Sequence, residues 1–573
     1  MPAYNTYKST MKKNTFLILS LLLLYLYPLS ASVEIRSNKL TTGDGLANNS
    51  TRYMMQDSKG FIWLGTLNGL SYYDGNSFAW NDLYEIVARA NMFLSKTDGV
   101  TFSDEKIKNQ FIGEAKFLRA LAYFDLVRYF GHIPIVLEPV SVNEAMTIKQ
   151  SKQVDVYETA IVPDLEDAVR KLVDTPLNYQ GNNASAGRAT LAAAKSLLGR
   201  VYLTMAGYPV QDESKKALAE QLFSEVIDYA RANNKYWAQT GDEWQKVWIS
   251  DNDNKYHIFE IQYIASKNYG NPMVFNSVPQ VNDSYTKLEM SGNRIWCEAR
   301  LAGRFKLMDT EGVSLDIRCP STIYTDDFVD DDGVPYTGGP FFQKFFEHKM
   351  KRKMLGYEDI DAQIADRTYF PINYPIIRLE DVMLMYAEIV GPTDKAKSLV
   401  DDICERAGVP TVPDHVTPEE FAEIVDWQRR LELASEGIRW HDLVRQNRYV
   451  EVLQEMFKFN GSDENGVISK PETYELYKLV TKDSYIYPIP DSQMNGKKMA
   501  VYTSHLDYLD DEKSPPVWFY GSEDFSLLLY FSLLYKVYLY QFPLALERKD
   551  RMLYRKHIDE VSTSPAQTNH CIP

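Results

Sequence analysis

Apolar positions recur every three or four residues through much of the chain between about residue 80 and residue 490, and this spacing predicts amphipathic helices. One stripe consists of Phe111, Ala115, Leu118, Ala122, Leu126 and Tyr129. A second consists of Leu191, Ala194, Leu198, Val201 and Met205, and a third of Leu379, Val382, Tyr386 and Ile389. The alanines let neighbouring helices approach closely. Paired helices of this kind predict a tetratricopeptide-like scaffold, although no strict repeat signature is present.

A fourth helix is predicted from its N-terminal signal, the sequence Thr417-Pro418-Glu419-Glu420. Thr417 suits the cap position, proline suits the first turn, and Glu420 completes a capping box. We expect this helix to end at Gly437, since glycine commonly follows the last helical residue.

Two regions depart from the helical pattern. In Leu40–Trp80, turn sequences such as Gly43-Asp44-Gly45 and Asp74-Gly75-Asn76 bracket short apolar runs, which predicts β-strands. In residues 236–375, Gly, Asn, Pro and Asp are frequent and aromatic residues are interspersed. This second region is predicted to be a loop-rich insertion mounted on the helices, and loops on a rigid scaffold commonly carry binding.

The N-terminus resembles a secretory signal peptide, predicted over residues 1–32. Lys12 and Lys13 precede the apolar run Phe16–Leu29, and small residues follow it. No cysteine follows that run, so no lipid-attachment site is evident. Near the other end, the apolar run Phe525–Leu546 contains a lysine and a proline, which make it a poor membrane span.

Charge and residue usage exclude several classes of function. The formal net charge is −16, and no Lys/Arg cluster suggests a nucleic-acid partner. Motifs for a nucleophile elbow, a phosphate loop, a dinucleotide site or a zinc peptidase are absent, and the eight histidines are scattered. We therefore expect a non-enzymatic protein with no metal and no cofactor.

The four cysteines and one acidic loop also bear on metal binding. The cysteines contain no CxxC pair; isolated buried thiols are expected, with a Cys297–Cys319 disulfide as the alternative. The acidic residues between Asp326 and Asp332 lack the EF-hand spacing, which favours a solvated loop.

Five segments resemble the SusD/RagB family in sequence, order and spacing. They are FIGEAKFLRALAYFDLVRYFGHIPIV (Phe111–Val136), GRATLAAAKSLLGRVYL (Gly187–Leu203), YPIIRLEDVMLMYAE (Tyr374–Glu388), RRLELASEGIRWHDLVR (Arg429–Arg445) and YIYPIPDSQM (Tyr485–Met494). The resemblance implies a mainly helical, SusD-like domain over residues 80–494, helical in 80–235, loop-rich in 236–375 and helical again in 376–494. It also implies a non-catalytic protein that captures an oligosaccharide or other nutrient and passes it to a SusC-like TonB-dependent transporter.

The two ends depart from the family pattern. The anchor cysteine and the family's first segment are absent, and residues 33–79 instead resemble one blade of a two-component regulator propeller, in the sequence GDGLANNSTRYMMQDSKGFIWLGTLNGLSYYDG. Residues 495–573 are an unrelated tail. We therefore expect a fusion, exported and surface-associated at the outer membrane, with a periplasmic location as the alternative. Two further functions stay open: a fragment of a periplasmic sensor and a helical-repeat adaptor for protein partners.

Within this framework, Trp296 in SGNRIWCEAR and Tyr269 in KNYGN are the candidate sugar-stacking residues, because they lie where the family faces its ligand. Trp237, Trp244 and Trp248 are weaker candidates, and the last two have the spacing of a buried helical stripe. The motif residues Arg378, Glu388, Arg439, Asp442 and Arg445 are predicted to form structural ion pairs and helix-end contacts rather than ligand contacts.

Overall fold

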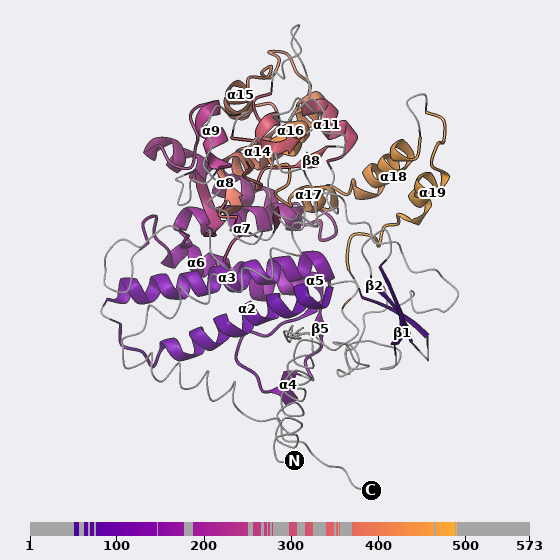
Figure 1. The fold of residues 1–573 in the computed structure, drawn as a ribbon. Helices are drawn as coiled ribbons and strands as arrows, with labels where there is room; N and C mark the ends of the chain where they lie inside the picture. The colour runs from indigo at the N-terminus through magenta and orange to yellow at the C-terminus, as the bar shows by residue number, and fades with distance from the viewer. Residues whose placement is uncertain are drawn as a thin grey trace, which may run out of the picture. The chain divides into compact units, whose positions relative to one another are not determined.

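The structure is a computed structural model (Figure 1). The chain divides into two compact units. It describes residues 51–56, 62–66, 69–73, 76–102, 104–145, 147–176, 187–249, 256–264, 269–271, 273–274, 278, 297–305, 316–324, 340–348, 351–352, 355, 370–462, 466–487 and 489. One unit comprises Met1–Met55 and Trp63–Tyr72, and the other comprises Gln56–Ile62 and Tyr73–Pro573.

The predicted β-region contains β1 (Thr51–Gln56), β2 (Ile62–Thr66) and β3 (Gly69–Tyr73), which form one sheet in that order. The helical region starts slightly earlier than expected, because α2 spans Asn76–Thr97. Trp80 therefore belongs to the helical core, where its ring packs 5.0 Å from that of Phe130.

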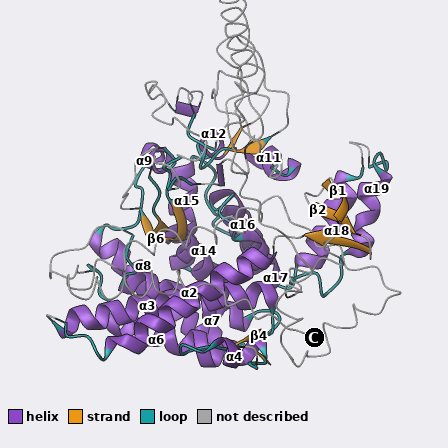
Figure 2. Ribbon diagram, turned by 60° about the horizontal axis from the view of Figure 1, so that its bottom comes forward, coloured by secondary structure: helices purple, strands orange, loops and turns teal. Residues whose placement is uncertain are grey.

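The helices of the larger unit pack in a series of neighbours (Figure 2). This series contains α3 (Glu105–Phe130), α6 (Val162–Lys171), α7 (Leu191–Ala206), α8 (Lys215–Asn233), α14 (Leu379–Val390), α15 (Asp394–Ala407) and α16 (Pro418–Glu432). Helix α3 contacts α2 and α6, α7 contacts α6 and α8, and α14 contacts α8, α15 and α16. The insertion between α8 and α14 thus leaves the series uninterrupted, as in a helical-repeat scaffold.

Shorter elements decorate this series. They are β4 (Ile133–Pro134), α4 (Val142–Ala145), β5 (Gln150–Ser151), α5 (Gln153–Val156), the π-helix η2 (Tyr157–Ile161), α9 (Gly241–Val247), β6 (His257–Ile261), α11 (Ala299–Phe305), α12 (Cys319–Thr322), β7 (Ile323–Tyr324), β8 (Phe341–Phe342), β9 (Tyr374–Arg378), α17 (Arg439–Arg445), α18 (Tyr449–Asn460), α19 (Pro471–Tyr474) and the 3₁₀-helix η3 (Glu475–Leu479). Antiparallel pairs join β4 to β5, β6 to β9 and β7 to β8.

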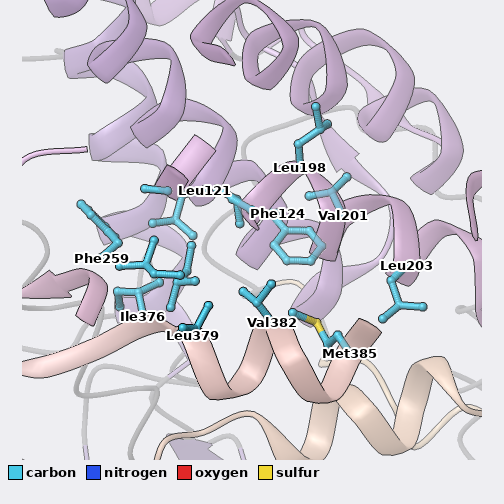
Figure 3. Close-up of a cluster of buried hydrophobic side chains, with 14 of the residues drawn as sticks. Leu121, Phe124, Leu198, Val201, Leu203, Phe259, Ile376, Leu379, Val382 and Met385 are labelled. Atoms are coloured by element: carbon cyan, nitrogen blue, oxygen red, sulfur yellow. The ribbon is translucent and has the colours of Figure 1, made fainter. Parts of the chain in front are cut away.

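The predicted apolar stripes form the core between these helices. Leu121 and Phe124 of α3, Val201 of α7 and Val382 of α14 meet there (Figure 3), and all four are at most 2% exposed. Helices α7 and α8 approach so closely at Gly199 that a Cβ atom there would lie 2.6 Å from the Phe223 ring. This contact requires glycine or a shift of the ring.

Polar contacts also join the first helices across the core. Arg119 of α3 donates to Asp164 of α6 through Nε (2.6 Å) and NH2 (2.8 Å). Its NH1 donates to the side chain of Asn91 in α2 (2.7 Å). One buried guanidinium therefore links three helices, and both of its partners are buried.

The carboxylate of Glu432, at the end of α16, accepts hydrogen bonds from several separate segments in the second half of the fold. Its Oε1 accepts from Trp244 Nε1 (2.8 Å), Arg378 NH1 (2.9 Å) and Arg406 NH2 (3.0 Å). Its Oε2 accepts from Arg318 NH1 (3.2 Å). Burial alone would raise the pKa of Glu432, but the surrounding guanidiniums outweigh it and hold that pKa far below its usual range.

The capping box predicted at Thr417 is confirmed, whereas the predicted helix end is wrong. The Glu420 N–H donates to Thr417 Oγ1 (3.2 Å), and the Thr417 N–H donates to Glu420 Oε2 (2.9 Å). The helix ends at Glu432 rather than at Gly437. The Glu432 carbonyl accepts from Arg378 NH2 (2.8 Å) and Lys344 Nζ (2.9 Å), so tertiary donors replace the next helical turn.

Replacing Glu432 by glutamine should lower the free energy of unfolding by about 3–5 kcal/mol, because three buried guanidiniums lose their shared counter-charge. Urea denaturation followed by circular dichroism measures the change. Glu423→Gln is the matched control, because Glu423 is exposed on the same helix, and its effect should stay within about 0.5 kcal/mol. Equal midpoints for the two variants would contradict the role assigned to Glu432.

Candidate ligand-binding site

The β6–β9 ribbon connects the helical series to the loop-rich insertion. Its register pairs His257 with Arg378 and Ile261 with Tyr374, and all residues of both strands are buried. At its end, Asn373 Oδ1 accepts from the Tyr263 N–H (2.8 Å), and Asn373 Nδ2 donates to Glu260 Oε1 (2.9 Å). The insertion therefore leaves the scaffold from a backbone that side-chain hydrogen bonds hold in place.

Tyr269 lies in a turn just beyond this ribbon, within the predicted loop. The Ile264 N–H donates to the Tyr269 carbonyl (3.0 Å), and the turn is followed by the fully buried Asn271. Asn271 donates through its backbone N–H to Phe370 O (2.6 Å) and through Nδ2 to Ile372 O (3.1 Å). Tyr269 is half-buried, and the hydrogen bonds of Ile264 and Asn271 attach this part of the insertion to the scaffold.

The other predicted stacking residue, Trp296, lies outside the described residues. Trp244 and Trp248 are buried core residues, as their spacing predicted, with ring centroids 5.7 Å apart. A ligand cannot reach either ring. Among the tryptophans whose side chains the structure describes, Trp237 and Trp427 are half-buried and Trp80 and Trp440 are buried.

Buried polar side chains attach the described parts of the insertion to the scaffold. Lys344 Nζ donates to Glu436 Oε1 (2.7 Å). Lys351 Nζ donates to three backbone carbonyls, those of Trp248 (2.6 Å), Gln343 (3.0 Å) and Lys344 (2.8 Å). Burial lowers the pKa of Lys351 to about 7. These contacts attach the segment around Lys344 and Lys351 to the helical scaffold.

His348, in the same segment of the insertion, is a neutral imidazole. The Lys351 N–H donates to His348 Nδ1 (3.2 Å), so Nδ1 carries no proton and Nε2 donates to Gln343 Oε1 (2.7 Å). The Gln343 amide is oriented for this by donating to Pro320 O (2.7 Å) and Ile323 O (3.0 Å). Burial, assisted by the nearby Lys351 charge, lowers the pKa of His348 well below its ordinary value.

The charged residues of the family-like motifs form ion pairs within the protein, as predicted. Arg445 NH2 donates to Glu388 Oε2 (2.7 Å) and to Asp442 Oδ1 (2.8 Å). Arg439 NH2 donates to Asp426 Oδ2 (3.1 Å). Arg378 pairs with Glu432, as described above. It also donates through Nε to Glu436 Oε2 (2.9 Å).

The motif segments also enclose a small polar cavity of about 50 Å³, whose lining includes Arg128, Arg200 and His441. At about 10–15 Å³ for each water, it holds roughly three to five water molecules and is too small for a sugar ring. The buried Nε2 of His441 and Nε of Arg200 have no protein partner, and such waters would satisfy them. These motif residues thus make contacts within the scaffold, in line with their predicted structural role.

The described cysteines Cys297, Cys319 and Cys404 are buried and form no disulfide bond, which confirms the prediction of buried thiols against the Cys297–Cys319 alternative. Burial raises the pKa of Cys404 to about 12. The described residues contain no group of His, Cys, Asp or Glu side chains that could hold a metal ion. Asp326–Asp332 and Phe525–Leu546 lie outside them.

A helix that is both long and apolar enough to cross a membrane is not found in the part of the chain that the structure describes.

The fold defines a class of protein: a mainly helical, tetratricopeptide-like scaffold that carries an insertion between α8 and α14. Comparison with known proteins gives the family. A family model described as "SusD family" matches residues 336–501, and one described as "Starch-binding associating with outer membrane" matches residues 10–203. Together they take in more than half of the chain. This chain belongs to the SusD/RagB family, and the starch-binding model associates it with the outer membrane.

Individual relatives agree with this assignment. A SusD-like protein from Bacteroides ovatus is 24% identical over 393 residues, which cover 65% of this chain and 66% of that protein. A SusD homologue from Bacteroides thetaiotaomicron has a TM-score of 0.58 and 25% identity, with 73% of this chain and 83% of that chain covered. A laminarin-binding SusD-like protein has a TM-score of 0.51 and 26% identity, with 72% and 85% covered.

Stability should fall as the pH drops from 7.5 to 5. The folded-state pKa of His348 is lowered, whereas the unfolded value is about 6.5. The unfolded chain therefore binds more protons below pH 6.5, and the stability that neutral His348 contributes above that pH is lost. Thermal melts across this range measure the slope, which His348→Gln should flatten. His415→Gln is the control, because His415 is exposed; a slope unchanged by His348→Gln would contradict the assignment.

Proposed function

We propose that this protein binds a glycan at the outer membrane without breaking any bond and passes it to a SusC-like TonB-dependent transporter. The observation that carries the proposal is the uninterrupted SusD-like helical series with an insertion fixed on it by buried hydrogen bonds. A binding surface that is fixed in this way lowers the entropy lost by the protein when a flexible oligosaccharide binds.

The ligand class is supported by a relative and by local chemistry. The SusD-like protein that binds laminarin is 26% identical to this chain and shares its fold. Tyr269 offers a partly exposed ring on a fixed backbone, and the C–H face of a sugar packs on such a ring. The sequence places Trp296 as a second stacking residue of the same insertion.

The family resemblance supports the proposed transporter partner and location. The family model associated with the outer membrane matches the N-terminal part of the chain, in keeping with the predicted export signal. The blade-like character of residues 33–79 stays a prediction, and the adaptor function, in which the helical series binds a protein, is the competing hypothesis.

Isothermal titration against a panel of soluble polysaccharides and oligosaccharides tests the proposal. Saturable binding to at least one glycan, with no change in its chain length after long incubation, is expected. Absence of binding across the panel, together with tight binding to a peptide, would favour the adaptor function. Shortening of the glycan would contradict the non-catalytic assignment.

Replacing Trp296 or Tyr269 by alanine should weaken glycan binding by about 1–3 kcal/mol, because each substitution removes a stacking surface. Tyr477→Ala is the matched control, since Tyr477 is a half-buried tyrosine of η3. Titration calorimetry gives the dissociation constants, and circular dichroism confirms that each variant is folded. Unchanged affinity in a folded variant would remove that residue from the site.

A further inference from the structure

A surface hollow of about 510 Å³ lies on the helical scaffold, apart from the loop that carries Tyr269. The end of α8, the segment before α9, and helices α14 and α15 bound it, and its lining includes Trp237, Leu379 and Met383. Its volume falls within the range of about 300–1,000 Å³ that is usual for small-molecule sites. The glycan contacts proposed above do not use it.

Trp237 is held in this hollow by the chain on both sides. Asn234 and Tyr236 have left-handed backbones, with φ of 49° and 63°. The sharp turn buries Tyr236 in the core and leaves Trp237 half-exposed. A left-handed backbone is common for an asparagine at a helix end but strained for a tyrosine, so the surrounding packing must hold Tyr236 in this conformation.

One side of the Trp237 ring is already occupied by Arg406, whose Cζ lies 4.1 Å from the ring centroid. Arg406 cannot swing away freely, since its NH1 donates to Glu380 (2.7 Å) and its NH2 to Glu432 (3.0 Å). The Trp237 indole is therefore held in a fixed orientation by Arg406. Arg406 is in turn held by Glu432, the buried carboxylate that joins α9, α15 and α16. Its exposed part is available to a ligand without a change of side-chain conformation.

Polar side chains also line the hollow around the Trp237 indole. Gln239 Nε2 donates to Asn234 Oδ1 (2.8 Å), which leaves further donor and acceptor capacity on both amides. Arg231 forms an exposed ion pair with Asp402, and the lining also contains the exposed Glu405 and the half-buried Lys235. Flat apolar surface beside amides and carboxylates matches a sugar, which has a C–H face and a rim of hydroxyl groups.

We propose that the Trp237 hollow is a second carbohydrate contact, selective for uncharged sugar units, on the scaffold itself. The inference rests on the proposed glycan-binding function and adds a second place of contact to it. Arg231 is paired with Asp402, and Arg406 with Glu380 and Glu432, so these two lining cations are already neutralised and do not favour a uronate or a sulfate. The net charge of −16 opposes polyanions further.

The test compares Trp237→Ala with Trp427→Ala in the full chain. Trp427 is a matched control because it is also half-buried beside guanidiniums, with Arg430 Cζ 5.1 Å and Arg304 Cζ 5.4 Å from its ring, but it does not line the hollow. The probes are a series of laminarin oligosaccharides and an oligomannuronate of equal length. Trp237→Ala should weaken binding of the longer neutral oligosaccharides about tenfold, Trp427→Ala should leave it unchanged, and Trp237→Phe should restore most of it.

A second measurement does not depend on the alanine variant folding. In protein labelled with ¹⁵N-tryptophan, the indole N–H signal of Trp237, assigned by its loss in Trp237→Phe, should shift on addition of the neutral oligosaccharide and not of the oligomannuronate. Gln239→Ala, which removes only a rim amide, should weaken binding severalfold.

The outcomes separate the two proposals. If wild-type protein binds the neutral series, but the Trp237 signal stays fixed and Gln239→Ala binds normally, the second contact is wrong and the proposed function stands. If no glycan binds to wild-type protein in the calorimetric panel or shifts any indole signal, the proposed function itself fails. Equal binding of the oligomannuronate at Trp237 would overturn the selectivity for uncharged sugars.

Discussion

The second half of this fold depends on one buried carboxylate, that of Glu432. It accepts from an indole of α9, from guanidiniums of β9 and α15 and from Arg318 beside α12, and its side chain is completely buried. A buried carboxylate with so many donors stays ionised because desolvation is outweighed by the surrounding positive charge. Neutral residues of similar size could fill the space, but they would not impose the same directions on four separate segments.

The same principle explains the charged residues of the five family-like segments. Their arginines and carboxylates pair across α3, α7, α14, α16 and α17 and enclose a cavity of about 50 Å³, which has room for a few waters only. Breaking one partner of such a pair would leave an uncompensated buried charge. The motif residues therefore stabilise the scaffold. They do not indicate which ligand the protein binds.

In the proposed function, aromatic residues carried by this scaffold contact the ligand. Asn271 and Asn373 hold the loop that presents Tyr269. Arg406, fixed by Glu380 and Glu432, holds the ring of Trp237. In both places buried polar groups restrain a partly exposed aromatic ring, so that binding a sugar requires little ordering of the protein.

The sequence alone predicts what depends on local spacing. The helical stripes, the capping box at Thr417, the β-strands before residue 76 and the pairing of motif charges within the protein follow from periodicity, from capping chemistry and from the resemblance. The SusD-like scaffold follows from the resemblance as well, and the family comparisons confirm it. Trp244 and Trp248 were likewise recognisable as a buried pair from their spacing of four residues.

Tertiary structure decides what depends on partners distant in the chain. Helix α16 ends at Glu432 and not at Gly437, because Arg378 and Lys344 take its last carbonyl. Trp80 belongs to the helical core, because Phe130 lies beside it. Trp237 differs from Trp244 and Trp248 only in what surrounds it. Local sequence can predict a helix and its cap, but the exposure of a ring and the counter-charge of a carboxylate are set by residues in other elements, such as Arg406 beside Trp237 and Arg318 beside Glu432.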